Sequence, residues 1–143
     1  MTLTQEQKAE VKETLDRYCA AYQRKDPKAL LELFSPDIHG FGAGPDEYFR
    51  NRKEYTPLLK RDLAQATSIS LELPDLFISG NGPIAWVMSN CNCTFVAKGE
   101  EKQTMRVRMT MGLRNTGNRW LIEQLHLSVP NTGQAPGQSF SGE

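Results

Sequence analysis

The sequence predicts one α+β domain in which helices come first and antiparallel strands follow. Apolar residues recur at helical spacing up to about residue 65, whereas from residue 69 onward they alternate with polar residues. A single change from helical to strand spacing of the apolar residues is typical of folds in which helices and strands are segregated. The length of 143 residues and a hydrophobic content of 38% fit a single globular domain.

The first helix is expected over residues 5–24. Thr4 and Gln7 have the spacing of a capping box, in which each side chain accepts a hydrogen bond from the other residue's backbone. The apolar stripe that follows at helical spacing consists of Val11, Leu15, Tyr18, Cys19 and Tyr22. A helix with one such stripe packs that side against a core.

A second helix is expected directly after the first. Asp26 can cap it, and Pro27 suits its first turn because that position needs no backbone N–H. Its inner stripe would consist of Ala29, Leu30, Leu33 and Phe34.

A short strand at residues 38–41 is expected next, and it runs into the glycine-rich turn GAGPDE. A third helix should then cover about residues 52–65. Pro57 lies inside that range and lacks a backbone donor, so the helix either starts late, at Thr56, or kinks.

The second half of the chain predicts a series of strands, because its apolar residues alternate with polar ones. The expected strands cover residues 69–73, 75–79 leading into 84–98, 103–114 and 119–129. Periodicity is lost in the tail NTGQAPGQSFSGE, which we expect to be disordered. The predicted organisation is therefore one domain at residues 1–130 and a tail at residues 131–143.

The two long hairpins predict which residues share a face of the sheet. Asn115-Thr116-Gly117 suits a three-residue loop whose last position is left-handed, and this register places Met109 opposite Glu123. A second three-residue loop at residues 99–101 would place Cys91 opposite Met109. One face becomes apolar and needs the helices as its cover. The other face resembles a protein interface and carries Trp86, Met88, Arg108, Trp120, Ile122 and His126.

The apolar face and the helices are expected to enclose a cavity. Glu123 is the candidate general acid or base, because desolvation on an apolar face would raise the pKa of its carboxyl group. The alternative is that Glu123 reaches solvent or pairs with a helix side chain. Residues three apart in a strand point to opposite sides, so His126 cannot join Glu123 and is interpreted as a structural histidine.

The other candidate ligand contacts are weaker. Tyr18, Tyr22 and His39 could offer polar groups to the cavity, although core packing is the stronger explanation for the tyrosines and a single histidine in a strand is more often a neighbour of the core. The expected apolar lining consists of Phe34, Phe41, Met109, Met111 and Leu127.

Composition excludes several classes of function. Seventeen basic residues balance seventeen acidic ones, so no overall field favours nucleic acid. No apolar run is long enough to cross a membrane, and the polar start MTLTQEQKAEVKE predicts a cytoplasmic protein. The three cysteines lack the spacing of metal ligands, so neither a metal nor a cofactor is expected.

Three segments resemble the SnoaL-like, nuclear transport factor two-like superfamily, which includes ketosteroid isomerase. They are AAYQRKDPKALLELFSPDIHGFGAGPDE, GPIAWVMS and LRNTGNRWLIEQLHLSVP, taken in that order. The ending is also similar to the association domain of calcium/calmodulin-dependent kinase II, through Trp120, Ile122, His126, Ser128 and Pro130. The resemblance implies a cone formed by a strongly curved antiparallel sheet around helices, a cavity at the open end, and dimerisation through the outer face.

The departures from these relatives leave the function open. The isomerase base is an aspartate on the first strand, where HGFGAG offers no carboxylate, and an arginine of the kinase association domain corresponds to Leu127. The leading hypothesis is a homodimeric domain that binds a small, mostly apolar molecule. The alternatives are an isomerase or lyase that uses Glu123, and a scaffold that assembles through the face with Trp86 and Trp120 without a ligand.

Overall fold

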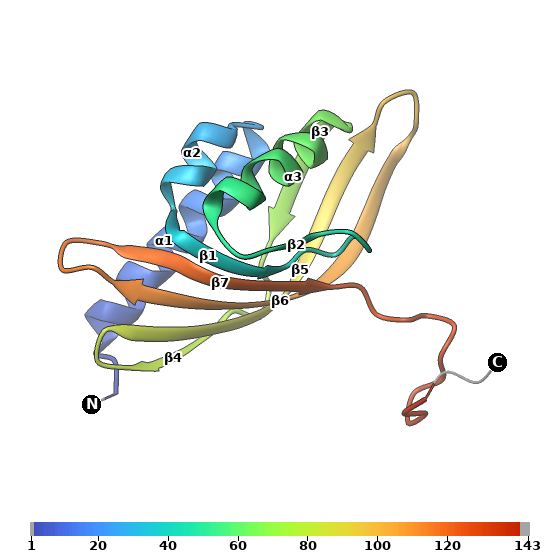
Figure 1. Cartoon of the computed structure of the whole chain (residues 1–143). Coiled ribbons are helices and arrows are strands. Elements are labelled where there is room, and N and C mark those ends of the chain that lie inside the picture. Colours follow the sequence, from blue (N-terminus) through green and yellow to red (C-terminus); the bar gives the residue numbers. More distant parts are fainter. Residues whose placement is uncertain (1, 141–143) are drawn as a thin grey trace.

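The computed structural model describes residues 2–140 and has the predicted α+β organisation, with three helices on the concave side of one curved sheet (Figure 1). The helices are α1 (Gln5–Gln23), α2 (Pro27–Glu32) and α3 (Arg52–Ala64). The strands are β1 (Phe34–Phe41), β2 (Tyr48–Phe49), β3 (Ala66–Glu72), β4 (Phe77–Asn81), β5 (Ile84–Ala97), β6 (Lys102–Asn115) and β7 (Trp120–Ser128). Their order in the sheet is β2-β1-β7-β6-β5-β3, with β4 also paired to β5.

Most neighbouring strands run antiparallel, but β1 and β7 pair in parallel. The β1 strand follows α1 and α2 in the chain and lies between β2 and β7 in the sheet. Beyond β7, residues 129–140 form neither helix nor strand. The expected disorder of the tail stays a prediction, and residues 141–143 lie outside the described residues.

Local capping signals determine where the helices begin. The backbone N–H of Gln7 donates to Thr4 Oγ1 at 3.1 Å and that of Thr4 donates to Gln7 Oε1 at 2.9 Å, which confirms the capping box. Asp26 caps α2 as predicted. Helix α3 begins at Arg52 with Asn51 as its cap, so the alternative of a late start at Thr56 is wrong.

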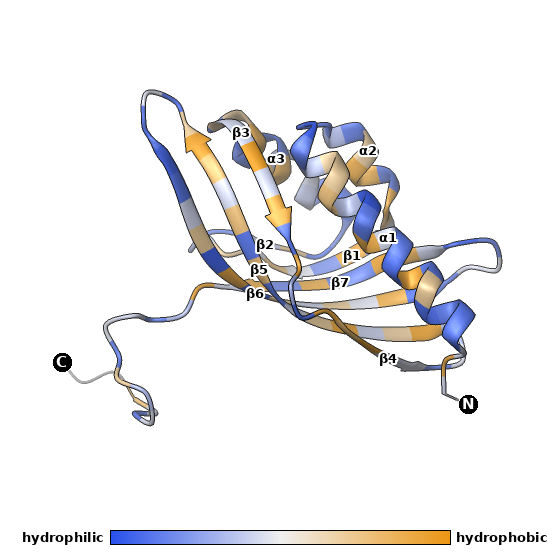
Figure 2. Ribbon diagram, turned by 180° about the vertical axis from the view of Figure 1, so that it is seen from behind, coloured by the Kyte–Doolittle hydropathy of each residue, from blue (hydrophilic) through white to orange (hydrophobic). Residues whose placement is uncertain are grey.

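The β5–β6 hairpin keeps the predicted faces but not the predicted register. Its connection spans residues 97–101, so Cys91 lies opposite Val107, and Met109 lies opposite Ser89. The pairs are shifted by two residues relative to the prediction. Because side chains alternate with a period of two, an even shift leaves every residue on its own face. Figure 2 shows the resulting alternation of hydrophobic and hydrophilic positions along these strands.

The β6–β7 hairpin departs from prediction in two ways. Its connection spans residues 116–119, and Asn115 pairs with Trp120. The side chains at the start of β7 therefore point to the face opposite to the predicted one. Further along, Gly112 pairs with Gln124 while Leu113 pairs with Ile122, so Glu123 is the extra residue of a β-bulge. The bulge restores the predicted orientation for the rest of β7, where Leu125 and Leu127 face inward.

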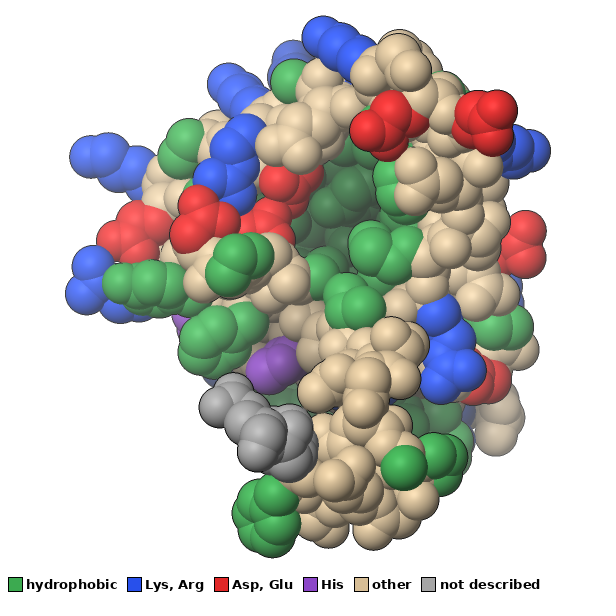
Figure 3. All heavy atoms as spheres, turned by 90° about the vertical axis from the view of Figure 1, so that its right-hand side faces the viewer, with side chains coloured by type: hydrophobic (Ala, Val, Ile, Leu, Met, Phe, Trp, Pro, Cys, Tyr) green, Lys and Arg blue, Asp and Glu red, His purple; other side chains and the backbone are tan. Residues whose placement is uncertain are grey.

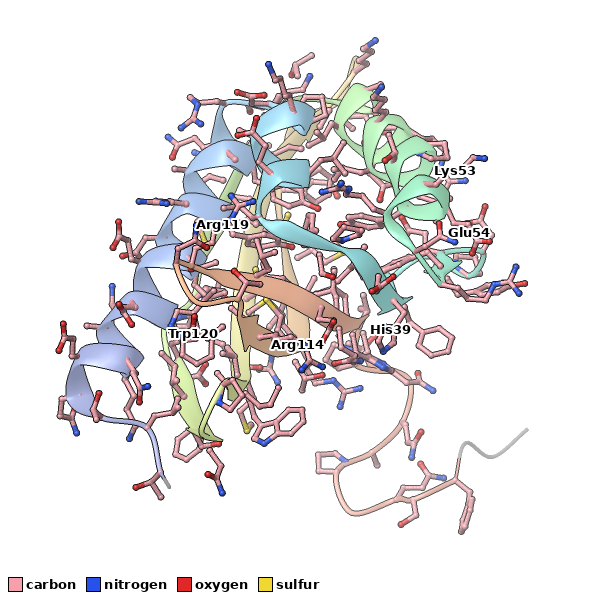
Figure 4. All side chains as sticks on the ribbon, turned by 60° about the vertical axis from the view of Figure 1, so that its left-hand side comes forward. His39, Lys53, Glu54, Arg114, Arg119 and Trp120 are labelled. Carbon is pink, nitrogen blue, oxygen red and sulfur yellow. The ribbon has the colours of Figure 1, made fainter. Side chains whose placement is uncertain are left out.

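Trp120 and Ile122 are therefore core residues, and their prediction as interface residues is wrong. Trp120 is only 4% exposed and Ile122 is fully buried. The indole Nε1 of Trp120 donates to Glu10 Oε1 at 3.3 Å, which ties the start of β7 to α1 (Figure 4).

A single core fills the space between the helices and the inner face of the sheet. Phe34 and Met111 were predicted to line a cavity, but they belong to the fully buried part of this core and do not line the cavity, so that prediction is wrong. Within residues 2–140, no helix is both long and apolar enough to span a membrane.

Candidate functional site

An apolar cavity of about 630 Å³ opens between α1, α3, the β1–β2 loop and the inner face of the sheet. Figure 3 shows it as a hollow lined by hydrophobic side chains, with charged side chains on part of its rim. The sheet supplies most of the apolar wall, through Ile69, Leu71, Cys91, Cys93, Phe95, Met105, Val107, Met109, Leu125 and Leu127. The cysteines are free, and burial raises the pKa of Cys91 to about 12, so it remains a neutral thiol.

Three tyrosines from two helices form a polar strip across this wall. Tyr18 and Tyr22 come from α1 and Tyr55 comes from α3, and the rings of Tyr18 and Tyr22 lie 5.0 Å apart between centroids. Burial is the main cause that raises the pKa of all three phenols well above the ordinary value. They are therefore neutral hydrogen-bonding groups at physiological pH.

A pair of carboxyl groups lies where this strip reaches the mouth of the cavity. Glu47 comes from the end of the β1–β2 loop, and Asp62 lies two turns after Tyr55 on α3. The two side chains are hydrogen-bonded to each other. Partial burial, and then the bond to Glu47, raise the pKa of Asp62 to about 8. With a pKa of about 8, Asp62 is mostly protonated at neutral pH and can donate its proton to a hydrogen bond with Glu47.

Arg61 neutralises the outer side of the mouth. Its guanidinium group donates two hydrogen bonds to Asp46, at 2.7 and 3.1 Å, and lies 3.7 Å from Glu47 Oε1. The bonds from Arg61 are the main cause that lowers the pKa of Asp46. Glu47 also accepts a hydrogen bond from the backbone N–H of Gly44, which fixes the loop over the mouth.

The structure brings some of the predicted ligand contacts to the cavity but not all of them. Tyr18, Tyr22, Met109 and Leu127 line it. His39 is exposed, and its Nδ1 lies 2.9 Å from the carbonyl oxygen of Asp37. Phe41 is also exposed and packs its ring on His126, with 5.4 Å between centroids. The predicted places of His39 and Phe41 in the cavity are wrong because the end of β1 faces solvent.

Glu123 does not line the cavity, so its predicted placement on the apolar face is wrong. As the extra residue of the β7 bulge, it turns toward Arg114, whose Nε donates to Glu123 Oε2 at 2.8 Å. The alternative that Glu123 forms an ion pair is closer to the structure, although the partner comes from the sheet and not from a helix.

Four predicted interface residues lie on the outer face of the sheet. Trp86 is 59% exposed, and Met88, Arg108 and His126 are exposed with it. Phe77 of β4 pairs with Met88 and is exposed as well, so it extends the same apolar surface.

Sequence reasoning missed Glu47, Tyr55, Arg61 and Asp62. Tyr55 and Asp62 are seven residues apart in a helix and therefore share one face, which was a usable signal. The turn GAGPDE contains Asp46 and Glu47, but nothing in its sequence shows that α3 lies beside it. No group of three or more His, Cys, Asp or Glu side chains within residues 2–140 is arranged to hold a metal ion.

The fold of this chain is that of solved structures described as nuclear transport factor 2-like proteins. A Pseudomonas putida KT2440 protein of unknown function has a TM-score of 0.81 at 22% identity and covers 98% of this chain and 99% of its own. A Streptomyces avermitilis protein, provisionally assigned as a dehydratase of the NTF2-like family, has a TM-score of 0.82 at 17% identity, covering 89% of this chain and 99% of its own.

A third structure is that of a Xanthomonas campestris protein provisionally assigned as a calcium/calmodulin dependent protein kinase II association domain. It has a TM-score of 0.78 at 18% identity and covers 86% of this chain and 87% of its own. Residues 11–132 match the model of the SnoaL-like domain, and the chain belongs to this family. No curated protein matches the sequence significantly.

Proposed function

We propose that this chain is a small-molecule-binding domain whose cavity takes a mostly apolar ligand. The observation that carries the proposal is the cavity of about 630 Å³, which has a continuous apolar wall and a few polar groups gathered at its mouth. Its volume lies within the range of about 300–1,000 Å³ that is typical of ligand pockets. Neighbouring structures share the fold alone, so they do not identify the ligand.

The proposed contacts divide by chemistry. Met109 and Leu127, together with the rest of the sheet wall, would pack on the apolar body of the ligand. Tyr22 would offer a polar contact, since it lines the cavity and is only partly buried. Tyr18 is almost fully buried and would act mainly by holding Tyr22 in place.

Adjacent residues on β5 offer a matched test of this proposal. Cys93 lines the cavity, whereas Thr94 lies on the outer face and its hydroxyl contacts that of Thr104 at 3.2 Å. We expect Cys93→Trp to fill the cavity and to abolish binding of the neutral dye Nile red, while Thr94→Trp retains it. Native mass spectrometry should likewise detect any co-purified molecule on the Thr94→Trp protein and not on Cys93→Trp. Equal binding by both variants would refute the proposal.

The proposal includes a homodimer that forms through the outer sheet face. Exposed Trp86, Met88 and Phe77 form an apolar surface with Arg108 and His126 nearby, and such a mixture of apolar and aromatic residues with arginine is typical of interfaces. The expected cytoplasmic location remains part of the proposal. We expect Trp86→Glu to convert a dimer into a monomer in analytical ultracentrifugation. A wild-type protein that sediments as a monomer at all concentrations would exclude this arrangement.

A second candidate function is acid–base catalysis by an isomerase or lyase. The observation that favours it is the raised pKa of Asp62 beside Glu47 in a largely apolar cavity, since a carboxyl pair with one proton can both donate and accept. Asp62 takes the role that the sequence suggested for Glu123. A panel of enolisable ketones tests this function: turnover that survives Glu123→Gln and is abolished by Asp62→Asn would support it.

A further inference from the structure

The charges at the mouth of the cavity are not balanced. Three carboxyl groups, those of Asp46, Glu47 and Asp62, face one cation, and among residues 2–140 Arg61 is the only positively charged side chain that lines the cavity. Arg61 makes its two hydrogen bonds to Asp46. The same guanidinium group lies 3.7 Å from Glu47 and 3.8 Å from Asp62, so a single cation serves three carboxyl groups. Because carboxyl groups outnumber cations here, the mouth is complementary to a positive charge.

Asp62 is the member of the pair that a ligand can reach. The Glu47 side chain is only 11% exposed, and its oxygens are engaged by the backbone of Gly44, by Asp62 and, at longer range, by Arg61. The Asp62 side chain is 43% exposed, and besides Glu47 its charged neighbour is Arg61, at 3.8 Å. Since Asp62 also lines the cavity, its carboxyl group is accessible to a ligand.

Aromatic rings surround the same end of the cavity. Tyr22, Phe49 and Tyr55 all line it, and the rings of Phe49 and Tyr55 lie 4.3 Å apart between centroids. Asp62 lies two helical turns after Tyr55 on α3, and both residues line the cavity. A carboxylate beside aromatic faces favours an organic cation, because the ring faces are themselves negative.

We propose that the ligand of this cavity is an amine with an apolar body, whose ammonium group is bound by Asp62 with support from Glu47. This inference rests on the proposed binding function and gives its ligand a chemical class. The apolar wall accepts the body of the ligand, whereas the acidic mouth repels a carboxylate group at the same position.

The proposal has a consequence for pH dependence. An ammonium group stabilises the ionised form of Asp62, so amine binding displaces the proton of the pair. Affinity should therefore increase as the pH rises from 6.5 toward 8.5, through the pKa of about 8, while an alkylamine stays protonated. The groups that face Asp62 are Tyr22 of α1, Tyr55 and Arg61 of α3, and Glu47 and Asp46 of the loop. None of the tyrosines titrates in this window, because the pKa of each is raised above its ordinary value.

Three probes with one ring system test the charge preference. Naphthylmethylamine, naphthalenemethanol and naphthoate place an ammonium, a hydroxyl and a carboxylate on the same apolar body. We expect the amine to bind at least about tenfold more tightly than the carboxylate at pH 7.5, with the alcohol in between, as measured by isothermal titration calorimetry. Calorimetry in two buffers of different ionisation enthalpy should also detect proton release for the amine alone.

Asp62→Asn should remove the preference for the amine, because it keeps the shape and loses the charge. Glu123→Gln is the matched control: it removes a carboxyl group outside the cavity and should retain the preference. If Asp62→Asn does not fold, the pH dependence and the proton release of the wild-type protein decide the question. Equal affinity for all three probes, or tightest binding of the carboxylate, would overturn the amine proposal and leave cavity binding intact. Binding that Cys93→Trp does not weaken would overturn cavity binding itself.

Discussion

Two carboxyl groups on opposite sides of the sheet show how strongly position determines chemistry. Glu123 lies outside the cavity and pairs with Arg114 at 2.8 Å, as an ordinary partly exposed ion pair. Asp62 lines an apolar cavity, where partial burial and then the neighbouring carboxyl group of Glu47 raise its pKa to about 8. The residue types are nearly the same. The difference shows that a functional carboxylate is recognised by what surrounds it in three dimensions rather than by the polarity of its sequence neighbours.

The largest effect on stability is expected from the two tryptophans, one on the inner side of the sheet and one on its outer face. Trp120 is 4% exposed and bonded to Glu10, whereas Trp86 is 59% exposed on the outer face. We expect Trp120→Ala to lower the free energy of unfolding by about 3–5 kcal/mol, because it leaves a cavity in the core. Trp86→Ala should change it by about 0.5 kcal/mol or less in the monomer. Urea denaturation at low protein concentration measures both values.

Equal losses of stability from the two variants would contradict the inward orientation of Trp120 at the start of β7. A dimer that dissociates on unfolding would add a concentration-dependent contribution to the Trp86→Ala value, so the measurement is repeated at two protein concentrations.

Much of the fold could be predicted from local sequence signals. The capping box of Thr4 and Gln7 and the cap at Asp26 each act over three residues, and the structure confirms both. The alternation along β5 and β6 also assigned faces correctly, because a register error of two residues does not turn a side chain over. Local signals therefore gave the element types and most of the faces.

The orientation of β7 could not be predicted, because two one-residue effects act on it. The longer connection turns Trp120 and Ile122 inward, and the bulge at Glu123 then restores the predicted orientation of Leu125 and Leu127. The bulge reverses the change in orientation that the connection causes. A prediction based on strict alternation of side chains is therefore correct for the end of β7 and wrong for its start. Gly112, which lies opposite Gln124 beside the bulge, was the one local hint.

The carboxyl pair was missed for a different reason. Glu47 ends a loop and Asp62 is a polar residue near the end of a helix, and each looks like an ordinary surface residue in sequence. Only the packing of α3 beside the β1–β2 loop brings them together, through Arg61 and its hydrogen bonds to Asp46. Such long-range proximity has no periodic signature.

The dependence of stability on pH offers a more moderate test of the same division. The pKa of Asp62 in the folded protein, about 8, lies above the unfolded value of 3.8. Between pH 3.8 and 8 the carboxyl group of Asp62 is protonated in the folded protein and ionised in the unfolded chain. The contribution of Asp62 to the stability of the folded protein is therefore full below pH 4 and is lost as the pH rises to 8. Asp62→Asn removes the titrating group. We expect the variant to gain stability relative to the wild type between pH 5 and 8.5, by no more than about 1 kcal/mol because solvent screens a half-exposed carboxyl.

Chemical denaturation at pH 5 and at pH 8.5 measures this change for both proteins. A stability difference between Asp62→Asn and the wild type that stays constant across this range would rule out the proton shared by Glu47 and Asp62.

The smallest effect is expected at the ion pair outside the cavity. Arg114 and Glu123 are 52% and 23% exposed, and solvent-exposed pairs contribute about 0.2–1 kcal/mol. Arg114→Ala should therefore lower the free energy of unfolding by no more than about 1 kcal/mol and leave the affinity for the naphthalene probes unchanged. A loss of affinity in Arg114→Ala would mean that the β7 bulge and the cavity are coupled through Leu125, which follows the bulge and lines the cavity wall. In that case the two sides of the sheet would act as one unit, and Glu123 would regain a part in binding as a positioning residue.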